Sequence, residues 1–490
     1  MLKRHWHYLL LLFLLFDFGY SFWHYMQFAL DGDLAPVVWP SEGFSHVLRD
    51  PFGLRVLLHN DRYPAPNRFF AHFFLFEYFR HVPLWLQHLL SPLDSLYAAC
   101  ALVKITAHAL IVYALAVAVS NRTHVLHEHF LLAAVLVSPL LQTSGFNYQM
   151  GVVDWSITYT AFYALPLALL LLFFLPFFRA AVHGTPLRVS WWGYAGLVGL
   201  ALIVSFSSPT IPGTALVVCP AVLLVGWYRR FAARSGQPWL LRASRALGDI
   251  PRPVLILFGL LSALSLYSLF IGLNNSENLW TNLPLAQRYA RLPLGVYYQF
   301  TSQFLTDEPL TGVGLPLLLA MLLVNAFLLG RQQRTPLGTH TLAVLKLLAL
   351  FALIYLLLLP LGGYRSYREF IVRRDTILPI TIGMIAAFAL SAFYLLTHLP
   401  KPSRWQYATA VAAFLAVFTL ADQFQPNKSN ACERALFTTL AQSPAPIVRL
   451  PATCTMMDWQ PLTDYRKSEL NGQMLQYWGI TKTPKRYYQQ

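Results

Sequence analysis

Residues 8–33 read YLLLLFLLFDFGYSFWHYMQFALDGD, an apolar run that closes on the acidic motif Asp31-Gly32-Asp33. A transmembrane helix needs about 20 consecutive apolar residues, so this run is long enough to cross a bilayer. Carboxylates are costly inside the hydrocarbon region, which places the motif at the membrane surface. There the two acids are either solvated or functional.

We expect the first apolar run to be a retained helix rather than a cleaved signal peptide. Lys3 and Arg4 resemble the charged start of a signal sequence. However, the apolar run exceeds the usual core of about 7–15 residues, and no small-residue cleavage site follows it.

The composition of the whole chain is that of an integral membrane protein. Of its 490 residues, 56% are hydrophobic and only 12% are charged, about half the charged fraction of soluble domains. We therefore predict an all-α polytopic membrane protein with about eleven transmembrane helices. The expected spans are 8–30, 95–119, 128–144, 157–178, 190–207, 210–228, 253–272, 311–330, 341–361, 376–397 and 405–421.

The basic residues of the loops predict the orientation. Short cytoplasmic loops are enriched in Lys and Arg, and the loop at 229–252 carries six arginines. We expect this loop and the N-terminus to be cytoplasmic. An odd number of spans then divides the chain into a transmembrane domain, 1–421, with a first outer loop at 31–94, and a periplasmic or extracellular tail, 422–490.

The net charge of +15 does not indicate nucleic-acid binding. The excess is spread over loops on both faces, and cytoplasmic loops are expected to be basic. The excess on the outer face instead favours anionic lipids or phosphorylated ligands.

Within the first outer loop, residues 67–90 mix aromatic and leucine side chains with charged ones. This mixture is typical of helices that lie on the bilayer surface. Pro83 is expected to break the segment into two short interfacial helices. The alternative is an additional span, which would place Glu77 and Arg80 near the membrane midplane.

The four cysteines differ in their expected surroundings. Cys100 and Cys219 lie within predicted spans and are expected to be small core residues. Cys432 and Cys454 both lie in the outer tail, where an oxidising compartment permits a disulfide between them.

Three carboxylates fall on the outer face and are candidates for catalysis. Asp31 and Asp33 follow the first span, and Asp154 lies between the third and fourth spans, so the three could converge. A carboxylate there can act as a general base on an acceptor hydroxyl or amine. Two acids could also hold a divalent cation, although no cofactor is certain. The alternative is that these acids cap helices.

Four arginines in the fifth outer loop are candidate phosphate ligands: Arg365, Arg368, Arg373 and Arg374. Arginine binds phosphate oxygens bidentately, so the cluster suits a pyrophosphate or a lipid phosphate. Alternatively, the cluster anchors lipid headgroups. Glu369 and Asp375 would neutralise part of its charge.

Three of the ionisable residues inside predicted spans are candidates for interaction with one another. Lys104 and His108 share one face of the second span, and Asp17 of the first span could pair with either of them. Intramembrane ionisable residues are functional candidates by default. Lys104 could instead extend to the outer surface.

The architecture resembles that of the GT-C superfamily, polytopic glycosyltransferases that use lipid-phosphate-linked sugars at the outer or lumenal face. The matching features are Asp31-Gly32-Asp33 after the first span, surface helices at 67–90, Asp154, and the basic segment 365–374. Asp-Gly-Asp stands where some members have a paired Asp-Glu, and the tail is shorter than in members with a large soluble domain.

The resemblance implies a polyprenyl-phosphate-linked sugar as donor, with Asp33 or Asp31 deprotonating the acceptor and the arginines stabilising the departing phosphate. It also implies a multi-pass protein of the cell envelope, such as a bacterial inner membrane, surrounded by lipids. No cytosolic nucleotide site is needed, and the sequence contains no GxxxxGK[ST] motif. The rival functions are a lipid or solute transporter or flippase, an O-antigen ligase or polymerase, and a non-catalytic membrane assembly subunit. The sequence leaves the sugar, the acceptor and the oligomeric state open.

Overall fold

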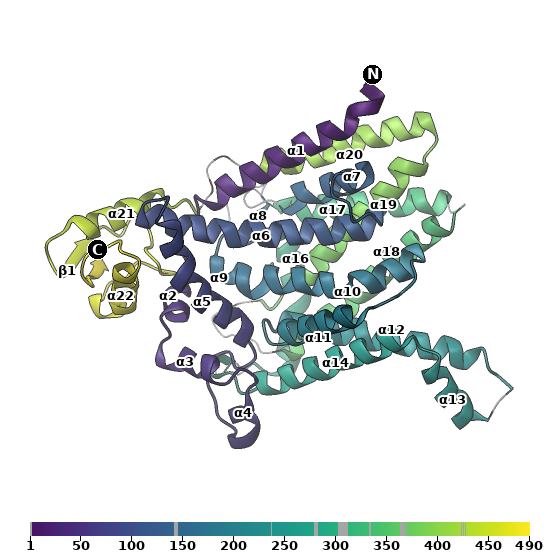
Figure 1. Ribbon diagram of the computed structural model, residues 1–490, viewed down its shortest axis with the longest axis horizontal. Helices are drawn as coiled ribbons and strands as arrows, with labels where there is room; N and C mark the ends of the chain where they lie inside the picture. The colour runs from purple at the N-terminus through teal and green to yellow at the C-terminus, as the bar shows by residue number, and fades with distance from the viewer. Residues whose placement is uncertain are drawn as a thin grey trace.

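The computed structural model describes residues 2–141, 146–236, 238–278, 283–301, 312–332, 335–362, 368, 370–422, 424, 426 and 428–490. These residues form a bundle of long helices with shorter helices gathered at one end (Figure 1). The fold class predicted from the sequence, an all-α polytopic membrane protein, is confirmed.

In the part of the chain that is described, 8 helical segments are long and apolar enough to cross a membrane. They are Trp6–Tyr25 of α1 (Leu2–Tyr25), α6 (Pro92–Ser120), α9 to α10 (Ile157–His183), α12 (Thr210–Ala232), α14 (Arg252–Gly272), α17 (Gly314–Arg331), α18 with η5 (Pro336–Leu361) and α19 (Leu378–His398). The remaining predicted spans correspond to shorter or less apolar helices: α7 (Glu128–Val137) with η1 (Ser138–Leu141), α11 (Trp191–Ser205) and α20 (Lys401–Ala421).

The first span ends earlier than the sequence predicts, at Tyr25 rather than at residue 30. Phe28 forms an antiparallel bridge with Ser429, and the backbone N–H of Ala29 donates to the carbonyl of Lys428 at 2.9 Å. Backbone groups after Tyr25 therefore form hydrogen bonds with the tail instead of the bonds that a longer helix would have contained. It also fixes the acidic motif against the tail.

The first loop and the C-terminal tail lie together at one end of the bundle, which we call the loop end (left in Figure 1). The first loop contributes α2 (Leu34–Val38), α3 (Glu42–Arg49), α4 (Leu54–His59) and α5 (Phe69–Leu86). The tail contributes α21 (Ala431–Gln442), η6 (Tyr465–Ser468), α22 (Glu469–Tyr477) and a parallel pair of strands, β1 (Ile447–Leu450) and β2 (Arg486–Gln489). The N-terminus and α13 (Trp239–Gly248) lie at the opposite end.

The span Ile157–His183 is built from α9 (Ile157–Tyr159), the π-helical turn η2 (Thr160–Ala164) and α10 (Leu165–His183). The short elements between spans are α8 (Asn147–Met150), η3 (Ser276–Asn278), α15 (Leu285–Ala290) and α16 (Leu292–Thr301).

Pro83 does not break the helix of the first loop, contrary to the prediction of two short helices. α5 is continuous from Phe69 to Leu86 with Pro83 inside it. Proline has no N–H to donate to the carbonyl of residue i−4, which here is Phe79. The indole N–H of Trp478 in the tail donates to that carbonyl instead, at 2.9 Å. The helix therefore continues because the tail supplies the missing donor.

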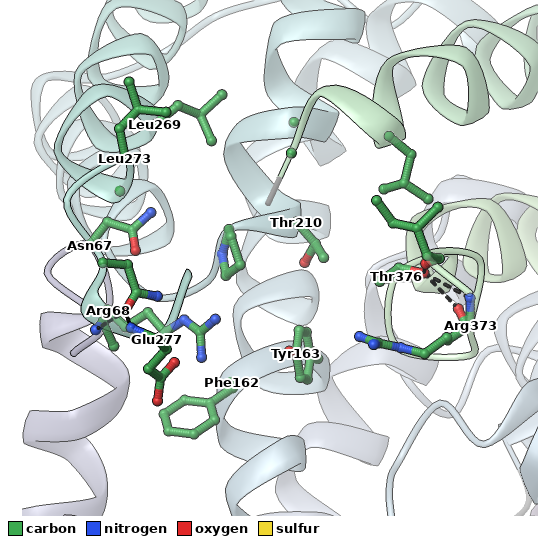
Figure 2. Close-up of a pocket in the computed structure, with 18 of the residues that line it drawn as sticks. Asn67, Arg68, Phe162, Tyr163, Thr210, Leu269, Leu273, Glu277, Arg373 and Thr376 are labelled. Carbon is green, nitrogen blue, oxygen red and sulfur yellow. Dashed lines mark hydrogen bonds between the residues drawn. The ribbon is translucent and has the colours of Figure 1, made fainter. Parts of the chain in front are cut away.

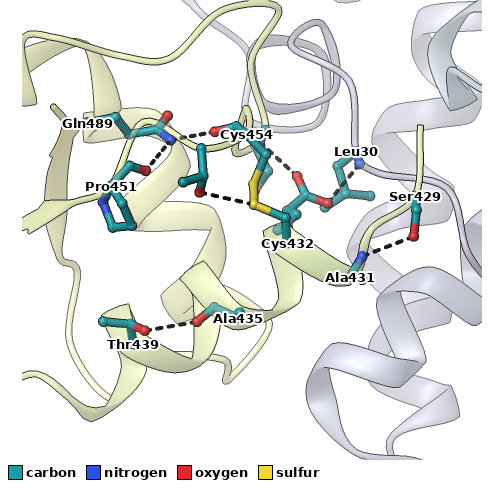
Figure 3. Close-up of a disulfide and its surroundings, with 12 residues drawn as sticks. Leu30, Ser429, Ala431, Cys432, Ala435, Thr439, Pro451, Cys454 and Gln489 are labelled. Carbon is teal, nitrogen blue, oxygen red and sulfur yellow. Dashed lines mark hydrogen bonds between the residues drawn. A yellow bond between two sulfur atoms is a disulfide. The ribbon is translucent and has the colours of Figure 1, made fainter. Parts of the chain in front are cut away.

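The tail packs into a core that it shares with the first loop. Phe437, Met474 and Trp478 of the tail are buried in the same hydrophobic cluster as Leu34 and Phe79 of the first loop. A disulfide joins Cys432 to Cys454, with 6.2 Å between their Cα atoms (Figure 3). The first loop and the tail thus form one packed layer over the loop end of the spans.

Candidate active site

A cavity of about 1120 Å³ opens where the loop end meets the spans (Figure 2). The first loop, η2, α12, α14, the end of α18 and the segment before α19 all contribute to its wall. Its polar and aromatic lining includes Asp33, Asn67, Arg68, His72, Tyr159, Tyr163, Glu277, Arg368, Arg373 and Trp459.

Asp33 lies on the wall of this cavity and is partly exposed. The indole N–H of Trp459 donates to its Oδ1 at 3.0 Å. Gly32 makes this contact possible, since a Cβ at residue 32 would lie 2.7 Å from the backbone nitrogen of Trp459. The small residue between the two acids therefore lets the tail close over the first loop and orient the Asp33 carboxylate.

Asp31 has a different environment although it is two residues away. It is fully buried and is not part of the cavity lining. It accepts hydrogen bonds from Ser156 Oγ at 2.8 Å, and from the backbone N–H and Oγ1 of Thr158 at 3.1 and 2.8 Å. Asp31 thus ties the acidic motif to the start of α9, and of the two acids only Asp33 faces the cavity.

Asp154 is also buried and outside the cavity lining. It forms an ion pair with Arg374 and accepts a hydrogen bond from the backbone N–H of Ser156 at 2.9 Å. Burial raises the pKa of Asp154, and the charge of Arg374 opposes that rise. Asp31 and Asp154 do lie close together, because both bind Ser156.

The four arginines of the fifth outer loop do not act as one group. Arg368 and Arg373 line the cavity, Arg374 is paired with Asp154, and Arg365 lies outside the described residues. Arg368 Nη2 donates to the hydroxyl of Tyr159 at 2.8 Å.

Asp375 holds two of these arginines. Its carboxylate accepts two hydrogen bonds from Arg373, at 3.0 and 2.8 Å, and lies 3.8 Å from Arg368. Burial alone would raise the pKa of Asp375, but the charges of Arg373, Arg368 and Arg374 outweigh burial and lower it to about 2. Asp375 is therefore ionised at all physiological pH values and fixes the arginine side chains in the wall.

Several residues of the cavity wall were not singled out from the sequence. Arg68, at the start of α5, places its guanidinium over the ring of Phe162, 5.6 Å from the centroid. His72 is buried beside it, and burial together with the charge of Arg68 lowers the pKa of His72 to about 3. Arg68 and His72 lie in the segment read as interfacial, where basic and aromatic residues have an ordinary membrane-surface explanation.

Phe162 and Tyr163 reach the cavity from the π-helical turn η2. Such turns are frequent at functional sites. No sequence signal marks the turn, because it lies inside an apolar run that a regular helix explains equally well.

Asp17 and His108 of the first two spans are linked by hydrogen bonds through a third side chain, and Lys104 is not part of this chain of bonds. Asp17 does not pair directly with His108. Instead Ser138 bridges them, donating to Asp17 and lying 3.1 Å from His108 Nε2. Lys104 does not extend to the surface, because it is buried, donates to the carbonyl of Trp155 and lies over the ring of Phe28.

The divalent cation considered from the sequence has no ligand set in the part of the chain that the structure describes. No three His, Cys, Asp or Glu side chains gather there closely enough to hold a metal ion. The described side chains of the cavity supply two carboxylates, three arginines and phenol hydroxyls to any reaction there.

No protein-family model matches the chain, and no curated protein matches it. Among solved structures, it is similar to the crystal structure of the Archaeoglobus fulgidus oligosaccharyltransferase, at 12% sequence identity and a TM-score of 0.38. The alignment covers 86% of this chain and 52% of that one, so the chain spans about half the length of that protein.

Proposed function

We propose that this protein is an integral membrane glycosyltransferase that moves a sugar from a polyprenyl-phosphate donor to an acceptor at the outer face of the membrane. One observation carries the proposal. A single cavity combines a carboxylate, Asp33, with two arginines, Arg368 and Arg373, and with an extended leucine-rich wall.

The leucine-rich wall fits the lipid part of such a donor. α14 contributes Leu266, Leu269, Phe270 and Leu273, and the end of α18 with η5 contributes Leu358, Leu359 and Leu361. Several of these side chains are apolar yet exposed, among them Leu273 at 76% and Leu361 at 57%. Contact between such an apolar surface and lipid chains is more favourable than contact with water. A prenyl chain can therefore enter the cavity from this side.

The polar wall fits the reacting groups. In the transfer, the bond between the anomeric carbon and the phosphate oxygen breaks, and the acceptor oxygen or nitrogen bonds to that carbon. Asp33 takes the proton that the acceptor loses. Arg368 and Arg373 stabilise the negative charge that grows on the departing phosphate, and Tyr159 and Asp375 hold the two guanidinium groups in place.

The disulfide of the tail supports action at the outer face. Structural disulfides persist in oxidising compartments and are rare in the cytosol. Cys432 and Cys454 lie in the same packed layer as Asp33, so the cavity and the disulfide share one side of the bundle.

The test measures sugar transfer from polyprenyl-phosphate donors by the purified full-length protein. Asp33→Asn should lower the transfer rate by about 100- to 10,000-fold while leaving donor binding nearly unchanged. Arg368→Ala should instead weaken donor binding. The matched control is Asp61→Asn, which removes an acid that is paired with Arg55 and lies outside the cavity lining.

Two results would overturn the proposal. Full transfer by Asp33→Asn would show that the acid only orients the loop. If the purified protein transfers no sugar from any such donor but moves a labelled lipid or solute across vesicles, it is a transporter or flippase.

A further inference from the structure

The proposed transfer uses one wall of the cavity and leaves another unexplained. Figure 2 shows Arg68, Asn67 and Glu277 on the side opposite Arg373 and Thr376, with Tyr163 between the two sides. Arg68 belongs to the first loop, whereas Arg373 belongs to the segment before α19. The cavity therefore carries positive charge on two separate walls.

Arg68 differs from Arg373 and Arg374 in having no carboxylate partner within the described part of the chain; the nearest partner of its charge is the ring of Phe162. Arg373 is paired with Asp375 and Arg374 with Asp154. Within the described ranges, Arg68 forms no ion pair, and its Nε is buried without a hydrogen-bond partner. A buried donor left unsatisfied typically costs about 1–3 kcal/mol, and an anion bound in the cavity would offset part of this cost at Arg68.

Two neutral polar groups beside Arg68 also line the cavity, the side-chain amide of Asn67 and the hydroxyl of Tyr163. Asn67 is 4% exposed and fits against Gly272, where a Cβ would lie 2.8 Å from its Nδ2. The packing therefore holds this amide at the wall.

The charges around these groups favour an anion. His72, one turn along α5, is neutral because burial and Arg68 lower its pKa. The carboxylates of Asp33 and Glu277 also line the cavity, so its described lining carries three arginines against two carboxylates. Tyr163 lies within electrostatic range of Arg68, Arg368 and Arg373, so one ligand of moderate size can contact both cationic walls.

We propose that Arg68, Asn67 and Tyr163 form a second anion subsite, distinct from the one at Arg368 and Arg373, that binds an oxyanion of the substrates. The inference rests on the proposed function for the identity of those substrates. The oxyanion belongs either to a second phosphoryl group of a diphosphate-linked donor or to a phosphate or carboxylate on the acceptor. Arg68 supplies the charge, and Asn67 and Tyr163 supply neutral donors.

The experiment measures binding by the detergent-solubilised full-length protein and needs no sugar transfer. The protein is saturated with a polyprenyl monophosphate and then titrated with inorganic phosphate. Wild type should bind the phosphate, and Arg68→Gln should weaken that binding about 10- to 100-fold, as expected for loss of a charge-assisted contact. Arg68→Lys should restore part of it.

Two controls separate this effect from misfolding and from general surface charge. Arg68→Gln should bind the monophosphate lipid as tightly as wild type does, since that contact is assigned to Arg368 and Arg373. Arg62→Gln changes an exposed arginine in the same loop that lies outside the cavity lining, and it should leave phosphate binding unchanged.

Replacing the monophosphate lipid with the diphosphate lipid identifies the source of the anion. If the diphosphate lipid abolishes phosphate binding, its second phosphoryl group occupies the subsite. If phosphate still binds, the subsite serves an anionic acceptor. If lipid-saturated wild type binds no phosphate, or if Arg68→Gln binds it as wild type does, the subsite does not exist. If wild type shows these binding results but transfers no sugar from any polyprenyl-phosphate donor, the glycosyltransferase assignment is refuted while the subsite stands.

Discussion

We expect the cost of replacing Trp478 with phenylalanine to depend on whether residue 83 is proline. Trp478 is fully buried, and its indole N–H donates to the carbonyl of Phe79 at 2.9 Å. In a regular helix that carbonyl would accept from the N–H of residue 83, which proline lacks. The indole is therefore the donor that completes α5.

The loss of unfolding free energy depends on which hydrogen bond each substitution removes. Trp478→Phe keeps an aromatic ring but leaves the carbonyl of Phe79 without this donor, at a cost of about 1–3 kcal/mol beyond the loss of packing. In a Pro83→Ala background, the N–H of residue 83 can satisfy the same carbonyl. Trp478→Phe should then cost only the packing loss, so the two substitutions should show a coupling free energy of about 1 kcal/mol or more.

Thermal unfolding of the four full-length variants in detergent measures the coupling, and tryptic cleavage of the tail provides a second readout. Trp239→Phe is the matched control, because this tryptophan is exposed and lies in α13 at the opposite end of the bundle. The effects of Trp239→Phe and Pro83→Ala on the free energy of unfolding should be additive. If the effects of Trp478→Phe and Pro83→Ala are also additive, within about 0.3 kcal/mol, the indole does not replace the missing helix donor.

Three further predictions concern the tail and the topology. Glu433 is buried, accepts hydrogen bonds from the backbone N–H groups of Leu30 and Met457, and burial raises its pKa to about 7. The folded state therefore binds the proton more tightly than the unfolded state does. Protonated Glu433 should contribute its full stability below its ordinary pKa of about 4.5, and this contribution should be lost as the pH rises through about 7. Glu433→Gln should make the melting temperature less dependent on pH in that range. Cys432 and Cys454, separated by 22 residues, should resist thiol labelling until the protein is reduced. The chain-entropy model assigns their disulfide a stabilisation of about 3 kcal/mol. Labelling of both cysteines in folded, unreduced protein would refute the bond. A reporter that is active only in the cytoplasm should be silent when fused after residue 490, and an active fusion would mean that the assumed odd number of crossings is wrong.

The sequence by itself determined the class of the fold and the grouping of the candidate residues. Membrane spans depend on the length of local apolar runs, which can be read without knowing how helices pack. Because successive spans alternate in direction, the acidic motif, Asp154 and the segment at 365–374 were expected on one side of the membrane. The structure places the described members of this group at the loop end.

The tertiary structure decided which of these residues face the cavity. Asp31 and Asp33 are equivalent by position, and they differ only because Ser156 and Thr158, more than 120 residues away in the chain, surround Asp31 with donors. The continuity of α5 through Pro83 likewise depends on Trp478 from the far end of the sequence. Phe162, which lies beneath the Arg68 guanidinium, lines the cavity from a π-helical turn that no local pattern marks. Each of these outcomes was set by a hydrogen bond or a contact between distant segments, and such a partner becomes known only once the chain has packed.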